Sequence, residues 1–147
     1  MKYLKIIIPL IFFLLICFAA NHSAERDKIH QDKLLHNNVK IHGIISSIKI
    51  SGNHCFAVLG IKNVKSNFTI FNSNTQKEFF PYLIKNDKAE IYTHICENEI
   101  MIGDSIYFDS NNLMLKVFGK NQYELNVNLI SEPTDIFFAK KNTQFPN

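Results

Sequence analysis

Tryptophan is absent from the 147 residues, and cysteine (three residues), proline (four) and glycine (five) are scarce. Three cysteines are too few for a small scaffold held together by several disulfides. The shortage of glycine and proline excludes a collagen-like chain and a flexible linker. The remaining composition is ordinary for a globular protein, with 46% hydrophobic residues, 20% charged residues and thirteen phenylalanines for a core. The length fits one domain with a short additional segment.

A strong excess of charge of one sign is also missing. The formal net charge is +3, and two of the cations, Lys2 and Lys5, belong to the extreme N-terminus. Without them the chain has 14 basic and 13 acidic residues. Such a nearly neutral domain has no electrostatic reason to seek nucleic acid, so we expect no nucleic-acid partner.

The first twenty residues form a basic start, Met1–Lys5, followed by fifteen residues without a polar side chain, Ile6–Ala20. That run is short for a membrane-spanning helix, which needs about twenty residues, and fits the core of a signal peptide. Two other interpretations stay open. Residues 1–20 remain uncleaved as an N-terminal anchor, or Cys17 is lipidated at a degenerate lipobox. In each case we expect an exported chain that is periplasmic or membrane-anchored and faces outward.

Residues 21–38 are polar and predict a linker that is partly helical. From Val39 the pattern becomes that of β-strands, with β-branched residues and period-two alternation. Gly43 lies inside the first strand, where glycine often marks a bulge or a bend. The apolar second strand predicts burial on both faces. The expected strands cover residues 39–45, 55–61, 67–71, 89–96, 105–109, 113–118 and 123–130.

One short helical segment is expected between the third and fourth strands. Thr75–Glu78 has the form of a capping box, and alternatively Pro81 starts a short helix that runs to Lys85. The fold class that follows is mostly β: a small antiparallel barrel, OB-like or SH3-like, of six or seven short strands over residues 39–132. The polar C-terminal tail, residues 133–147, is expected to be frayed.

Two short motifs carry a resemblance. Gly43-Ile44-Ile45 opens the β region, and Ile102-Gly103-Asp104-Ser105-Ile106 precedes a late strand. Over Val39–Phe118 the chain resembles small uncharacterised exported bacterial proteins. Those proteins have a signal or lipoprotein leader and a compact β domain whose late strand begins with Gly-Asp-Ser. The resemblance implies the fold and the export, and it brings no catalytic residues.

Cys55 and Cys96 are the two cysteines of the exported part. An even pair in an oxidising compartment predicts a disulfide, and the alternative is two buried free thiols. Together with His54 and His94 they also have the residue types of a Cys₂His₂ zinc site. Adjacent residues of a strand point to opposite faces, however, and the spacing matches no standard zinc finger. We therefore expect no metal and no cofactor.

No constellation of catalytic residues is evident. The serines lack a Gly-x-Ser-x-Gly setting, and His30, His36 and His42 have no spacing that marks a base or a metal ligand. Asp104 and Asp109 are candidates for a carboxylate pair, but a turn and a strand end explain both. The expectation is that the protein is not an enzyme and has no catalytic residues.

Four aromatic residues offer a platform of the kind that OB-folds use for ligands, although a place in the core is favoured for them: Tyr92, Tyr107, Phe108 and Tyr123.

The function expected first is a binding or interaction module of the cell envelope, with a protein or peptide partner. The second hypothesis is an inhibitor or immunity-type protein that acts against an envelope toxin or enzyme. A small hydrolase comes third, and it would need a pocket with convergent polar groups. Contact with the membrane is expected only through the N-terminal segment. The ligand-binding residues are not identified by these patterns.

Overall fold

The computed structural model describes residues 4–52, 54–72, 78–96, 99–120 and 122–145. By backbone contacts the chain divides into two units, Met1–Leu34 and Leu35–Asn147. The first unit is most of a single helix, α1 (Leu4–Leu35), which contains Pro9. The expected partly helical linker is thus helical through Leu35. The helix is long and apolar enough to cross a membrane, a test that signal sequences near an N-terminus also pass.

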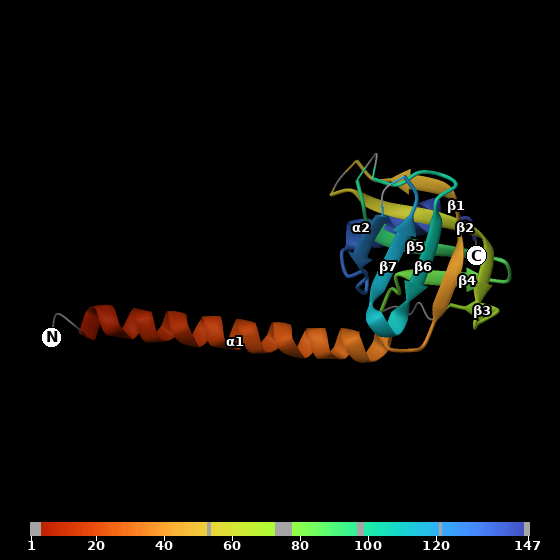
Figure 1. Ribbon diagram of the computed structural model, residues 1–147. Coiled ribbons are helices and arrows are strands. Elements are labelled where there is room, and N and C mark those ends of the chain that lie inside the picture. The colour runs from red at the N-terminus through yellow and green to blue at the C-terminus, as the bar shows by residue number, and fades with distance from the viewer. Residues whose placement is uncertain (1–3, 53, 73–77, 97–98, 121, 146–147) are drawn as a thin grey trace. The chain divides into compact units, whose positions relative to one another are not determined.

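The second unit is mostly β, as expected. Its eight strands form one antiparallel sheet in the order β3-β4-β5-β2-β1-β6-β7-β8 (Figure 1). Each expected strand overlaps an observed one. The bounds are β1 Lys40–Ile50, β2 Phe56–Ser66, β3 Ile70–Phe71, β4 Tyr82–Lys85, β5 Lys88–His94, β6 Ser105–Asp109, β7 Met114–Phe118 and β8 Gln122–Asn126. A short 3₁₀ helix, η1 (Ser110–Asn112), connects β6 to β7.

The sheet is open, so the expected closed barrel is not confirmed. Among the described residues, the two outermost strands, β3 and β8, do not pair with each other. A single antiparallel bridge joins Phe79, ahead of β4, to Ile130, beyond β8, and the Ile130 amide donates to the Phe79 carbonyl at 2.9 Å. Strand β3 has only two residues, which is too few to continue the ladder to β8.

The expected helix from Pro81 to Lys85 is wrong, because this segment is strand β4. Its side chains alternate with a period of two, and Tyr82 and Ile84 point into the core. Asn86, with a φ of 59°, supports the tight turn into β5. Of the alternative capping box, Thr75, Gln76 and Lys77 lie outside the described residues.

The expectation of a frayed C-terminal tail is also wrong. Pro133 begins a helix, α2 (Pro133–Asn142), a position where its missing N–H costs nothing. Ala139 is fully buried, and Ile136 and Phe138 pack against an apolar cluster of the sheet. The sheet contributes Phe56, Val58, Phe79, Tyr92 and Ile130 to this cluster. The helix therefore covers one face of β2 and β5.

Two expectations for the first two strands are confirmed. The register of β1 on β2 shifts between His42 and Ile44, so the irregularity expected at Gly43 is present, and the extra residue lies opposite it in β2. A side chain at Gly43 would collide with Ile61 and with the carbonyl of Lys62. Strand β2 is buried on both faces over Phe56–Ile61, because α2 covers one face and the main core covers the other. The main core includes Ile41, Ile45, Leu59, Ile61, Ile84, Ile91, Phe108, Leu115 and Val117.

Candidate interaction surface

Cys55 and Cys96 form a disulfide, with 4.7 Å between their Cα atoms. Cys55 precedes β2 and Cys96 follows β5, and the pairing of Phe56 with His94 places these strand ends side by side. The Ile95 amide also donates to the Cys55 carbonyl at 2.8 Å. The predicted bond is therefore present, and it ties together two strands that neighbour each other in the sheet. Cys17 is exposed on α1.

The histidines next to these cysteines do not converge on a shared site. His54 is exposed, and His94 lies 3.2 Å from the Asp135 carboxylate of α2. Within the described ranges, no group of three His, Cys, Asp or Glu side chains is arranged to hold a metal ion. Since both sulfurs are bonded to each other, a Cys₂His₂ zinc set is not formed. His30 lies in α1, and His36 follows its end.

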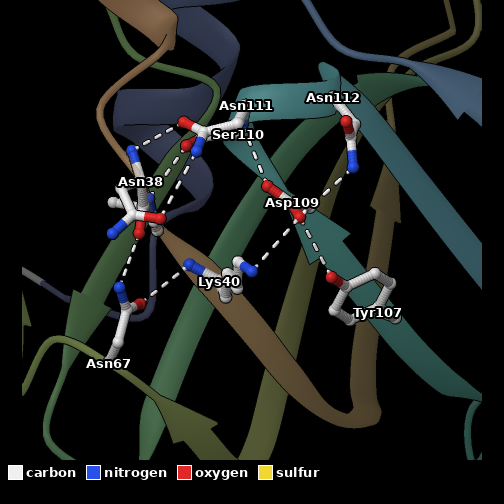
Figure 2. Close-up of polar contacts among 9 residues, drawn as sticks. Asn38, Lys40, Asn67, Tyr107, Asp109, Ser110, Asn111 and Asn112 are labelled. Carbon is white, nitrogen blue, oxygen red and sulfur yellow. Dashed lines mark hydrogen bonds and ion pairs between the residues drawn. The ribbon is translucent and has the colours of Figure 1, made fainter.

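Asp104 and Asp109 lie at opposite ends of β6 and do not form a pair. Asp104 accepts the amide of Met101 at 2.8 Å and thereby closes its own turn. Asp109 is buried and caps η1 through the Asn111 amide at 3.0 Å. Its second oxygen accepts from the Tyr107 hydroxyl at 3.1 Å, and Figure 2 also shows the contacts of this carboxylate with Asn112 and Lys40. Both carboxylates thus have structural partners.

The start of β1 is held by a second polar cluster beside Asp109 (Figure 2). The Asn38 amide donates to the Asn111 side chain at 2.9 Å, and the Val39 amide donates to the Ser110 hydroxyl at 2.8 Å. Asn67, from beyond β2, donates to the Asn38 carbonyl and accepts the Lys40 amide. These side chains are used to fix the chain where it enters the sheet, and sequence reasoning gave none of them this role.

The four aromatic residues considered as a platform are divided between the two faces of the sheet. Tyr92 and Phe108 are buried, so the interpretation as core is confirmed for them. Tyr123 pairs with Val117 and is half-buried on the inner side, whereas Tyr107 is half-buried on the outer side. The four rings therefore do not make one platform.

A row of cross-strand neighbours runs across the outer face instead, and we call it the His42–Tyr107 row. Its register joins Lys65, His42, Tyr107, Lys116 and Glu124 on β2, β1, β6, β7 and β8. The rings of His42 and Tyr107 lie 4.5 Å apart between centroids. The Lys116 ammonium and the Glu124 carboxylate pair at 2.7 Å. The row thus combines an aromatic pair with charges of both signs on a surface that α2 leaves uncovered.

The local electrostatics keep the Tyr107 phenol protonated. Partial burial raises its pKa, and the hydrogen bond to Asp109 and the negative charge of that residue raise it further. Lys40 and Lys116 act in the opposite direction. At neutral pH the phenol therefore donates its hydrogen bond to Asp109, and its ring lies tilted against that of His42. This arrangement suits recognition, because tyrosine combines a large apolar body with a polar end.

A buried carboxylate is the feature that sequence reasoning missed most clearly. Glu90 is 1% exposed, and it accepts hydrogen bonds from the Tyr92 hydroxyl at 2.6 Å and the Thr143 hydroxyl at 2.8 Å. The Gln144 amide donates to its other oxygen. The alternation of β5 was the only available signal, and it could not show that the C-terminal segment returns to this strand.

No protein-family model, curated protein or solved structure matches this chain.

Proposed function

We propose that this chain is a non-catalytic interaction domain that works outside the cytoplasm, delivered or held there by α1. The observation that carries this proposal is the presence of α1 and of the Cys55–Cys96 disulfide on one chain. The apolar part of α1 has a mean hydropathy of 2.0, a value typical of a signal sequence or an anchor. Disulfides persist in oxidising compartments and are rare in the cytosol, so the two features support the same destination.

The surface proposed for the partner is the His42–Tyr107 row, and the partner is a protein or peptide of the cell envelope. The row presents the exposed His42 ring and the half-buried Tyr107 ring between charged residues, and aromatic side chains are enriched at interfaces whose rim is polar. Of the buried carboxylates, Asp109 and Glu90 are occupied by structural hydrogen bonds, and Asp135 lies 3.2 Å from His94. A role in binding requires no catalytic side chain, whereas a hydrolase would require a base and a nucleophile within reach of each other.

Export is tested by the intact mass of the protein recovered from its own cells, measured without reductant and then with it. A mass that matches a chain starting near Ala20, and that increases by two daltons on reduction, supports both cleavage and the disulfide. A full-length mass with the same rise supports a retained anchor. Acyl chains on Cys17 would make the protein a lipoprotein. A full-length, fully reduced chain would contradict the proposed compartment.

Partner binding is tested with a photo-crosslinking amino acid placed at His42 in intact cells. The matched control places it at Phe137, which is 69% exposed on α2. We expect a discrete adduct at residue 42 that is absent at residue 137, and loss of that adduct when Tyr107 is also replaced by Ala. If the adduct is a toxin or enzyme whose activity this chain reduces, the protein is an inhibitor. Equal labelling at both positions would contradict a dedicated surface.

A further inference from the structure

Three lysines stand directly opposite one another across three neighbouring strands. Lys62 of β2 pairs with Lys88 of β5, and Lys88 pairs in turn with Lys85 of β4. All three are exposed on the outer face of the sheet. Directly opposed like charges destabilise a sheet, because their Cβ atoms are only about 5 Å apart. The arrangement therefore lowers the stability of the fold. A role in binding would explain why the three lysines are placed together.

A bulge in β2 adds a fourth lysine to this face. His42 and Ile44 are two residues apart on β1, but their partners Lys65 and Lys62 are three residues apart on β2. The extra residue is accommodated at Asn63, whose φ of 55° is left-handed. Lys65 is thereby turned to the same side as Lys62. We call these four residues, Lys62, Lys65, Lys85 and Lys88, the lysine patch.

Two carboxylates lie near the lysine patch in the sequence: Asp87 is exposed in the turn between Lys85 and Lys88, and Glu90 follows Lys88 on β5. In the part of the chain that the structure describes, none of the four lysines forms an ion pair. Glu90, two residues beyond Lys88 on the same face, is buried and is taken up by Tyr92, Thr143 and Gln144. The patch thus begins where the cover provided by the C-terminal segment ends, and its positive charge is open to an anion.

Apolar side chains flank the patch at both ends. Ile44 pairs with Lys62 at one end, and Ile70 pairs with Lys85 at the other. Ile70 is 66% exposed, whereas the ring of Phe68, two residues earlier, lies 5.9 Å from that of Phe71 between centroids. Lysines interspersed with exposed apolar groups are typical of surfaces that rest on the boundary between lipid headgroups and acyl chains. A soluble polyanion would use the charges alone.

Within the folded domain, the patch lies next to the start of β1, because Lys65 pairs with His42. Asn67, two residues after Lys65, is hydrogen-bonded to the backbone of Asn38 and Lys40. Only His36, Asn37 and Asn38 separate α1 from Val39, the residue before β1. A domain tethered this closely to an apolar helix meets the same membrane at a high effective concentration.

We propose that the lysine patch docks the domain onto the anionic lipid surface of the membrane that α1 enters, with Ile70 inserted among the headgroups. This inference rests on the proposed export through α1. Each lysine near an anionic leaflet strengthens partition about fivefold, and the attraction declines when salt shortens the Debye length.

The test is lysine acetylation of the full chain in lipid nanodiscs, read at each lysine by mass spectrometry. One set of nanodiscs contains phosphatidylcholine alone, and the other contains about one-third phosphatidylglycerol. We expect the four patch lysines to react several-fold more slowly in the anionic discs, with the difference abolished by high salt. Lys120 and Lys141, outside the patch, should react equally in both. Equal reactivity of the patch lysines in the two lipids would overturn the proposal.

Lys88→Gln is the decisive variant, because Lys88 faces both Lys62 and Lys85. Its removal should reduce the protection of the other patch lysines about fivefold while leaving the domain as stable as before or more stable. Lys120→Gln changes the net charge equally and should leave the protection intact. An equal loss of protection from acetylation in both variants would overturn the assignment to lipid. Stronger protection of the patch lysines by soluble polyglutamate than by the anionic discs would also overturn it.

A cleaved form of the protein allows the lipid-binding proposal to be tested separately from the proposal of export. If the intact mass shows that the apolar part of α1 has been cleaved off near Ala20, the recovered protein is sedimented with vesicles of the same two compositions. Sedimentation with the phosphatidylglycerol vesicles alone, reduced by Lys88→Gln, supports the patch without an anchor. Absence of sedimentation with either vesicle would overturn the lipid surface while leaving export intact.

Discussion

The Thr143 hydroxyl donates a hydrogen bond at 2.8 Å to Glu90, a carboxylate on β5 that is 53 residues away in the sequence. This contact joins the C-terminal segment to the outer face of the sheet, next to the cluster on which α2 packs. The Gln144 side chain adds a hydrogen bond to the Ala89 carbonyl at 3.0 Å. The segment that follows α2, through Gln144, is therefore part of the folded domain.

Glu90→Gln should destabilise the domain by about 2 kcal/mol, because an amide nitrogen would replace one acceptor oxygen and face a donor. Chemical unfolding of the full chain in mild detergent measures the loss. Faster hydrogen exchange at Gln144 would show where the structure opens. Glu124→Gln, which alters an exposed ion pair, should cost less than about 1 kcal/mol. Equal losses in the two variants would contradict the role given to Glu90.

Removal of the disulfide should lower the free energy of unfolding by about 4 kcal/mol, because the bond closes a loop between residues 41 positions apart. The double variant Cys55→Ala and Cys96→Ala is compared with the parent chain by the same unfolding measurement. Reductant should destabilise the parent and leave the double variant unchanged. Cys17→Ala serves as the control and should retain the full stability. A parent chain insensitive to reductant would contradict the prediction.

Alkaline pH should destabilise the fold through buried tyrosines. Burial raises the pKa of Tyr82 to about 12, although hydrogen bonds with Asn37 and Ser110 lower it, and the unfolded value is about 10. The folded state then holds this proton more tightly than the unfolded state. The stabilisation is complete below pH 10 and is lost as the pH rises towards 12.

Unfolding measured from pH 8 to pH 12 checks this prediction against Tyr82→Phe. The variant should lose stability less steeply above pH 10, since Phe has no proton to release. Some decline in stability should remain, because the pKa of Tyr92 is also raised. Burial is the main cause, and the charge and the hydrogen bond of Glu90 add to it. Identical slopes in the parent and the variant would contradict the assignment to Tyr82.

Asp109→Ala should cost about 1–2 kcal/mol, because it removes the cap of η1 and leaves the Asn111 amide without its acceptor. The loss should also be visible as faster hydrogen exchange at Asn111. Asn112→Ala removes only one donor, at 3.3 Å from the same carboxylate, and should have a smaller effect. A larger loss from Asn112→Ala would contradict the importance of the cap.

Most strand positions could be predicted because alternation is a property of neighbouring residues. The double burial of β2 followed from its apolar run, and Gly43 marked the position of an irregularity whose extra residue lies in β2. Strand β4 was missed because Pro81 is equally compatible with the start of a helix. The helix α2 was missed because its apolar side is completed only by the sheet cluster around Phe56 and Tyr92.

The sequence by itself determined the apolar N-terminal run, the mostly β fold and the pair of cysteines in the domain. The tertiary structure alone decided which strands are neighbours. Strand pairing bonds Cys55 to Cys96, brings the ring of His42 against that of Tyr107 and sets Lys62 opposite Lys88. The physical reason is that strand pairing joins residues far apart in the sequence, whereas periodicity reports only which side of a strand each residue occupies.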